Sequence, residues 1–151
     1  MNPRSEAAPG PSKPKDLLLT RTFDAPRRLV FEAWTKAEHV SRWFAPRPLT
    51  MARCEVDFRA GGGFRFVMLT PDGIEYPFEG SFREIAPPER IVFSGKIHDG
   101  NEVVTTITFA DQGDETLLTV HQSYAFESDS SRGAQQGWTL TLDQLGKHLN
   151  T

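Results

Sequence analysis

The feature that most constrains this chain is a run of short β-prone segments between Thr50 and Tyr124, separated by turn signals. The turn signals are Gly61-Gly62-Gly63, Pro71-Asp72-Gly73, Pro87-Pro88-Glu89, Asp99-Gly100-Asn101 and Gln112-Gly113-Asp114. Connections this short join antiparallel strands, because a parallel pair needs a crossover of a dozen or more residues. The sequence therefore predicts a meander of six antiparallel strands.

One long amphipathic helix is predicted after the strands. Trp138, Leu142, Leu145 and Leu149 follow one another at helical spacing and form one apolar stripe. A helix of about 18 residues would be about 27 Å long, enough to cross a sheet. Because an apolar sheet face has to be covered, the predicted fold is α+β, with a curved antiparallel sheet of six to seven strands around the C-terminal helix.

The residues before the meander predict one further strand and two short helices. Leu17 to Phe23 is β-prone, and Pro26 suits the first turn of a helix, with Asp24 placed to favour its N-terminus. Thr35 and Glu38 have the spacing of a capping box, so a second helix is expected to start there and to end near Phe44.

Composition limits the classes of protein to consider. The first fifteen residues carry four prolines and few apolar residues, so residues 1–15 are predicted to be a disordered tail and residues 16–151 one folded domain. The chain has no apolar run of about 18 residues, which argues against a membrane protein. A single cysteine, Cys54, and the lack of a secretory signal favour the cytoplasm. The net charge of −3, without a basic stripe, argues against nucleic-acid binding.

Several local motifs resemble one known family. They are Thr20-Arg21-Thr22-Phe23-Asp24-Ala25-Pro26, Val30-Phe31-Glu32-Ala33-Trp34-Thr35, Glu38-His39-Val40-Ser41-Arg42-Trp43-Phe44, Val56-Asp57-Phe58-Arg59-Ala60-Gly61-Gly62, Glu84-Ile85-Ala86-Pro87-Pro88-Glu89-Arg90 and Gln136-Gly137-Trp138. From Leu17 to Leu149 the chain resembles the START-like (SRPBCC) superfamily, in the bacterial branch related to the heat-shock chaperone ATPase activator. The resemblance implies the helix-grip fold. It also implies one of three roles: hydrophobic ligand binding, cyclase or hydratase chemistry, or partnership with a chaperone.

The aromatic residues on the predicted inner faces are the candidate ligand-binding site. An antiparallel sheet closed by one helix can leave a cavity lined by apolar groups with a few polar anchors. Tyr76 and Gln122 are the polar anchors that we expect inside, although Gln122 could instead satisfy the backbone at a sheet end. The alternative for each aromatic residue is that it only fills the core. The complete predicted set is Trp34, Trp43, Phe64, Phe66, Tyr76, Phe78, Phe93, Gln122, Trp138 and Leu142.

The sequence contains no motif for catalysis, a metal or a cofactor. The four histidines are scattered and lack zinc-ligand spacing, and no nucleophile-elbow pattern is present. We therefore predict no catalytic residues, no metal and no cofactor. The leading prediction is binding of a small hydrophobic or aromatic molecule without covalent catalysis. A cyclase- or hydratase-type enzyme remains the alternative, and a chaperone or a second copy of the chain remains as a protein partner.

Overall fold

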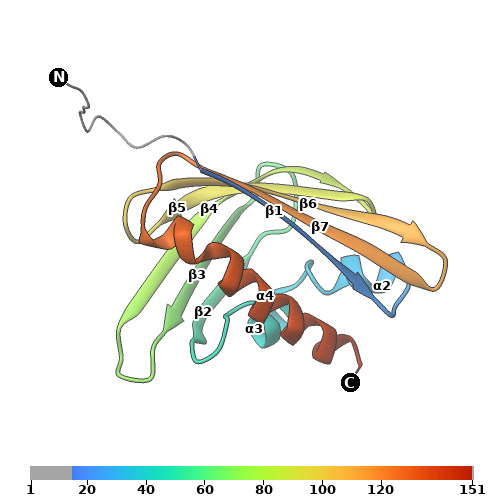
Figure 1. The fold of residues 1–151 in the computed structure, drawn as a ribbon, viewed down its shortest axis with the longest axis horizontal. Helices are drawn as coiled ribbons and strands as arrows, with labels where there is room; N and C mark the ends of the chain where they lie inside the picture. Colours follow the sequence, from blue (N-terminus) through green and yellow to red (C-terminus); the bar gives the residue numbers. More distant parts are fainter. Residues whose placement is uncertain (1–14, 151) are drawn as a thin grey trace.

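The structure, a computed structural model, describes residues 15–150 as seven strands and three helices (Figure 1). The strands are β1 (Lys15–Phe23), β2 (Thr50–Val56), β3 (Gly63–Leu69), β4 (Glu75–Ala86), β5 (Arg90–Ile97), β6 (Glu102–Gln112) and β7 (Glu115–Tyr124). The helices are α2 (Arg27–Glu32), α3 (Ala37–Trp43) and α4 (Asp129–Leu149). The predicted order of elements is therefore confirmed.

All seven strands form one antiparallel sheet in the order β1-β7-β6-β5-β4-β3-β2. The strands from β2 to β7 form the predicted meander, and β1 adds to the free edge of β7. Because β1 and β2 lie at opposite edges, the chain has to cross from one edge to the other between residues 23 and 50. The short helices α2 and α3 make that crossing (Figure 1).

Helix α4 lies across the concave face of the sheet (Figure 1). Its apolar stripe is buried there: Leu142 and Leu145 are fully buried, and Trp138 is nearly so. Along β6, Val103, Thr105, Ile107 and Phe109 are buried and alternate with more exposed residues, so this parity of the strand faces inward. The helix and the inner sheet face thus share one hydrophobic core.

Two glycines, Gly80 in β4 and Gly95 in β5, allow the sheet to bend around α4. They are paired directly across the two strands. A Cβ built on Gly80 would lie 1.8 Å from the carbonyl oxygen of Ser94, and one on Gly95 would lie 2.3 Å from that of Glu79. Such a close backbone approach excludes any side chain, so this pairing of β4 with β5 depends on glycine at both positions.

Two helix starts differ from the sequence prediction. The capping box at Thr35 and Glu38 is wrong: the N-cap of α3 is Lys36 without a side-chain bond, and the Thr35 hydroxyl donates backward to the carbonyl of Glu32. The first turn of α2 likewise has no side-chain cap, and Pro26 precedes its first residue. The Thr35 side chain is used to close the end of α2 instead.

The capping box of this fold lies at the start of α4. The Ser128 hydroxyl accepts from the backbone of Ser131, and the Ser131 hydroxyl accepts from the backbone of Ser128. Helix α4 therefore begins at Asp129 and has 21 residues, slightly more than the length expected from the sequence. Except for Lys15, which begins β1, the residues predicted as a tail lie outside the described part of the chain. No helix within residues 15–150 has the length and apolar character to cross a bilayer.

Candidate functional site

All the predicted aromatic residues except Tyr76 gather in one cluster between the sheet and α4. Seven of the eight are buried, and only Tyr76 is half-buried. The helices contribute Trp34, which follows α2, Trp43 from α3 and Trp138 and Leu142 from α4. The strands contribute Phe64 and Phe66 of β3, Phe78 of β4 and Phe93 of β5.

The rings in this cluster pack mostly edge to face, with Trp34 and Trp138 near its centre. Trp34 and Trp138 stack with centroids 6.3 Å apart and planes inclined by 21°. Phe44 bridges the helices to the sheet, 5.8 Å from Trp138 and 5.1 Å from Phe66. Phe44 is absent from the predicted ligand-binding set, although it follows Trp43 directly in an apolar pair that could also have formed a partner-binding patch. The cluster thus joins three helices to the inner face of the sheet.

The indole nitrogen of Trp34 is the one polar atom of this cluster that is left without a partner. Trp34 is only 5% exposed, and its Nε1 has no hydrogen-bond partner among the described residues. The neighbouring Trp43 differs, because its Nε1 donates to the carbonyl of Ala33 at 3.1 Å. Buried indole N–H groups usually have an acceptor, so the Trp34 donor is chemically available inside the core.

A buried polar trio lies on the same inner face. The Gln122 side-chain amide donates to the Thr105 hydroxyl at 2.9 Å, and the Tyr124 hydroxyl donates to the Gln122 oxygen at 2.9 Å. Burial raises the pKa of Tyr124 to about 12, and the negative charge of Asp99 adds to this effect. Tyr124 therefore stays a neutral hydrogen-bonding group, and Gln122 is held in one orientation by its two neighbours.

Strand register connects the polar trio to the aromatic cluster. Phe93 of β5 pairs with Thr105 of β6, which in turn pairs with Gln122 of β7. These residues form one row across the concave face. Gln122 is therefore buried as predicted, but Thr105 and Tyr124, which the site prediction omitted, are the groups that hold it.

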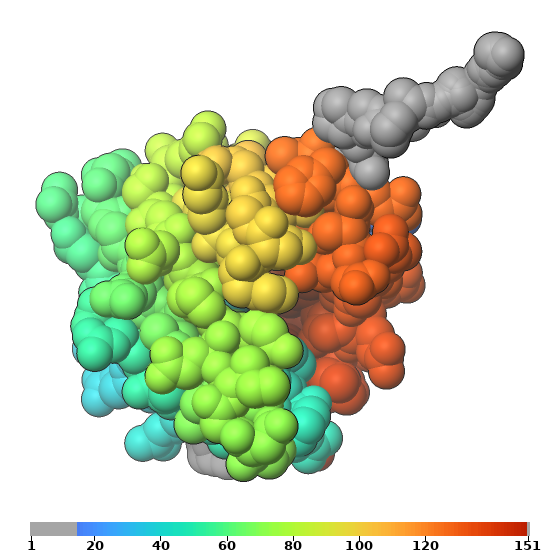
Figure 2. Space-filling view, turned by 90° about the vertical axis from the view of Figure 1, so that its left-hand side faces the viewer, coloured from blue at the N-terminus to red at the C-terminus, as the bar shows by residue number. Residues whose placement is uncertain are grey.

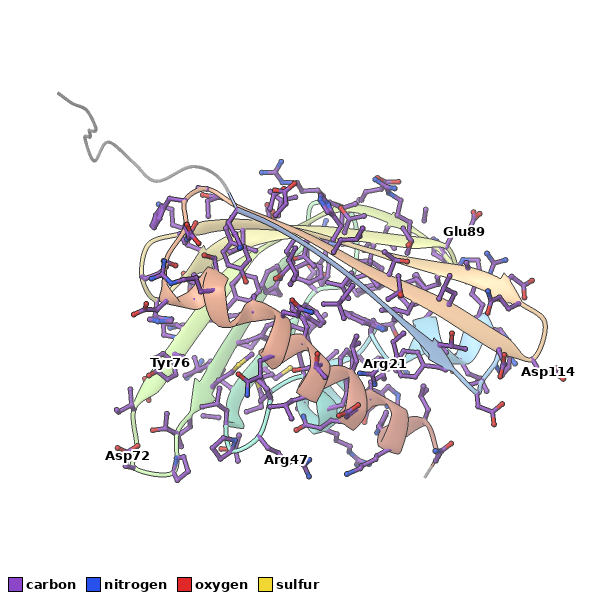
Figure 3. All side chains as sticks on the ribbon, in the orientation of Figure 1. Arg21, Arg47, Asp72, Tyr76, Glu89 and Asp114 are labelled. Atoms are coloured by element: carbon purple, nitrogen blue, oxygen red, sulfur yellow. The ribbon has the colours of Figure 1, made fainter. Side chains whose placement is uncertain are left out.

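Tyr76, the other predicted polar anchor, lies at the border of the cluster. Its ring contacts the ring of His98 at 4.6 Å, and the residue is half-buried. Figure 3 labels Tyr76 beside β4, on the side of the molecule where α4 begins. In Figure 2, which views this side directly, the surface is indented between the green and yellow strands and the orange helix.

The two surface pockets that stand out lie elsewhere, around the C-terminal half of α4. One, of about 360 Å³, lies between the end of β1 and α4 and includes Leu142 from the predicted set. The other, of about 500 Å³, lies between α3, the start of β2 and the last turns of α4. The predicted aromatic residues line neither pocket.

The described core holds no charged side chain that could act as an acid or a base. Its buried polar residues are serines, threonines, Asn101 and Gln122. Within residues 15–150 there is also no group of three or more His, Cys, Asp or Glu that could hold a metal ion. Burial raises the pKa of the Cys54 thiol to about 11, so this thiol is a poor nucleophile near neutral pH.

A curved antiparallel sheet closed by one long C-terminal helix, with two short helices after the first strand, defines the helix-grip class of the START-like superfamily. The chain belongs to the family described as Activator of Hsp90 ATPase homolog 1-like protein, whose model matches residues 24–150. No curated protein matches the sequence.

Several solved structures share the fold over nearly their whole length. Protein CV1439 from Chromobacterium violaceum superposes with a TM-score of 0.85 at 25% identity, covering 91% of this chain and 99% of its own. Mll3558 from Rhizobium loti gives 0.79 at 28% identity, with 89% and 96% covered. NE0264 from Nitrosomonas europaea gives 0.78 at 26% identity, with 90% and 94% covered.

Proposed function

We propose that this protein binds a small hydrophobic or aromatic molecule between the sheet and α4, without covalent catalysis. The observation that carries the proposal is the buried and unpartnered indole N–H of Trp34. A ligand with one acceptor atom, such as a carbonyl oxygen, would satisfy this donor and place its apolar part against the ring of Trp138. An apolar pocket with few polar contacts is the usual design of such sites.

The packing of the rings affects the free energy of ligand binding. Phe44, Trp34 and Trp138 are in mutual contact, so a ligand has to separate or replace ring contacts when it enters. Burying about 300 Å² of apolar ligand surface would contribute about 7 kcal/mol before the costs of association and ordering. Those costs leave dissociation constants in the micromolar to millimolar range.

Binding is favoured over a cyclase or hydratase reaction by the chemistry of the inner face. A general acid or base must titrate near the working pH. Within the polar trio, Tyr124 is the residue that can ionise. Burial raises its pKa to about 12, and its hydroxyl already donates to the Gln122 oxygen. The described core offers Gln122 and Thr105 to orient a ligand, but no carboxylate or imidazole to react with it.

The proposal is tested by titrating a panel of apolar and aromatic molecules while following intrinsic tryptophan fluorescence. A saturable change that is altered in the Trp138→Phe variant would support a ligand against α4. The absence of any saturable response across the panel, in protein shown to be folded, would overturn the proposal. Turnover of a bound compound would instead favour the enzymatic alternative.

The family description supports a second candidate, interaction with a chaperone. The matching family is described by homology to an activator of the Hsp90 ATPase. The measurement is the ATPase rate of an Hsp90-type chaperone with and without this chain. A rate that rises saturably with the chain would favour this candidate, and an unchanged rate at excess chain would eliminate it. Both proposed functions assume a cytoplasmic location, which cell fractionation would check.

A further inference from the structure

The larger surface pocket lies outside the ligand site proposed above. It has a volume of about 500 Å³ and is formed by α3, the segment after it, the start of β2 and the end of α4. Arg47, one of its lining residues, is labelled below α4 in Figure 3. The lining residues are Ser41, Arg42, Ala45, Arg47, Leu49, Thr50, Met51, Gln144, Lys147 and His148.

The lining of this pocket is cationic without a compensating carboxylate. It contains Arg42, Arg47, Lys147 and His148 but no Asp or Glu. Within residues 15–150, no ion pair joins the first three of these side chains to an acid. Burial lowers the pKa of His148, and the nearby His39 and Arg42 lower it further, so His148 is mostly neutral near pH 7 and Arg42, Arg47 and Lys147 carry the positive charge.

The adjacent smaller pocket makes a useful contrast. It shares Arg47 and Lys147 with the larger one but also includes Asp24 and Asp143. Asp143 accepts from Arg21 at 2.7 Å, so part of the positive charge there is neutralised. An anion would therefore be drawn to the larger pocket rather than to its neighbour.

The frame of the larger pocket is held rigidly by one side chain of α4. The amide of Gln144 donates to the carbonyls of Trp43 and Ala45 at 2.8 and 2.7 Å. Its oxygen accepts from the backbone N–H of Arg47 at 3.0 Å. These bonds fix the segment that carries Arg47 against the helix that carries Lys147, so the two cations are presented from a preorganised frame.

We propose that this pocket binds an organic phosphate, with the phosphate between the cations and an apolar group over Leu49 and Met51. Several cations match a dianion better than a singly charged carboxylate, and guanidinium groups pair with phosphate oxygens in a fork. Ala45, Leu49 and Met51 supply the apolar part of the lining. The Thr50 hydroxyl is a further donor, whereas the Ser41 hydroxyl already donates to the carbonyl of Glu38 at 3.3 Å.

The test uses phenyl phosphate as the probe and backbone amide shifts in nuclear magnetic resonance as the readout. The expected result is a saturable shift confined to residues 41–51 and 144–148, weaker at higher salt. The neutral analogue phenol should not produce it, and benzoate should bind more weakly. Saturable shifts elsewhere, equal binding of phenol or tighter binding of benzoate would each overturn the proposal.

Matched variants separate the pocket from the general charge of the protein. Arg47→Gln with Lys147→Gln should weaken phenyl phosphate binding about tenfold, as two partly exposed charge contacts would. Arg28→Gln with Lys96→Gln removes the same charge at exposed positions outside the pocket and should leave binding unchanged. Equal weakening in both variants would overturn the proposal. So would binding to phosphatidic acid vesicles without binding of phenyl phosphate, because the ligand would then be a membrane headgroup.

Discussion

At the scale of single residues, the neighbouring indoles of Trp34 and Trp43 differ in one hydrogen bond. Trp34 and Trp43 contact each other with centroids 4.7 Å apart, and both are buried. Trp43 donates to the carbonyl of Ala33, whereas the Trp34 donor has no protein acceptor among the described residues. The Trp43 donor is therefore used within the protein, whereas the Trp34 donor remains available to the ligand that we propose.

This difference predicts unequal effects of the same substitution. Both Trp34→Phe and Trp43→Phe remove part of a buried ring, but only the second leaves the Ala33 carbonyl without its donor. The free energy of unfolding should therefore fall by about 1–2 kcal/mol more in Trp43→Phe. Urea unfolding of the two variants measures the difference. Equal losses would mean that the Trp34 N–H also has a partner in the folded protein.

The Trp34 donor also predicts a ligand preference. Acetophenone carries an acceptor where ethylbenzene, of similar size and shape, carries none. Wild-type protein should bind acetophenone more tightly by about fivefold to tenfold, the worth of one buried hydrogen bond. Trp34→Phe should remove the preference while still binding ethylbenzene, and calorimetry provides both affinities. A preference that survives in the variant would assign the acceptor contact to another residue.

Tyr124 predicts an alkaline limit to stability. Its pKa rises from the ordinary value of 10.0 to about 12 in the folded protein, so the unfolded chain releases this proton first. The contribution of Tyr124 is complete below pH 10 and is lost as the pH rises towards 12. The free energy of unfolding should therefore fall more steeply over this range than in Tyr124→Phe. Both proteins should carry Cys54→Ala, since the pKa of Cys54 is raised as well. Parallel pH profiles would contradict the assignment.

At the scale of elements, α4 organises the molecule through both of its ends. Its N-terminus is fixed by the Ser128 and Ser131 capping box. Near its C-terminus, Thr141 and Gln144 donate to the carbonyls of Trp43, Phe44 and Ala45. Those carbonyls lie at the end of α3, where the helix leaves them without intrahelical partners. Helix α4 thus caps α3 as well as covering the sheet.

The capping role of Gln144 can be tested with a matched glutamine on the same helix. Gln144→Ala removes three hydrogen bonds and should lower the free energy of unfolding by about 2 kcal/mol. Gln136→Ala, at an exposed position of α4, should change it by less than about 0.5 kcal/mol. Chemical denaturation measures both. Similar effects of the two substitutions would contradict the capping role.

The surroundings of two glycines, Gly80 in β4 and Gly133 in α4, predict opposite effects of substitution by alanine. Gly80→Ala would force a Cβ against the Ser94 carbonyl and should cost about 3 kcal/mol or prevent folding. Gly133→Ala in α4 meets nothing within 4 Å and should stabilise the protein by about 0.5–1 kcal/mol. Thermal unfolding of both variants checks this. A tolerated Gly80→Ala would show that the strands can separate at this point.

Hydrophobic periodicity was sufficient to predict the elements, and it grouped the residues that share a face without deciding which strand face is buried. Leu142 and Leu145 of α4, and Ile107 and Phe109 of β6, are buried as their spacing indicates. The caps were harder: Ser131 at the third helical position is not the usual partner of a capping Ser, and Thr35 has a competing acceptor in Glu32. A motif predicts a cap only when no other bond competes for the side chain.

The sequence predicts which residues belong to the candidate site, but not which of them contact one another. Alternation along the strands predicts that Phe64, Phe66 and Gln122 face inward. It does not predict that Thr105 lies beside Gln122, because that depends on the register of β6 and β7. The pairing of Gly80 with Gly95 and the missing acceptor of Trp34 depend on tertiary contacts in the same way.

At the scale of the whole molecule, the sheet, the helix and the crossing helices enclose one aromatic core with two kinds of polar feature. The inner face carries the Trp34 donor and the trio around Gln122. The outer end of α4 carries the basic pocket around Arg47 and Lys147. We propose an uncharged apolar ligand for the first and an anion for the second, so the two proposals can be tested independently.

The most direct test of this account is to locate a bound apolar ligand by intermolecular nuclear Overhauser effects. With acetophenone at saturation, we expect contacts from its ring protons to the indole of Trp138 and the ring of Phe66. We also expect a downfield shift of the Trp34 Nε1 proton as it gains an acceptor. Contacts only to residues around Arg47 and Lys147, with the Trp34 resonance unchanged, would contradict a binding site between the sheet and α4.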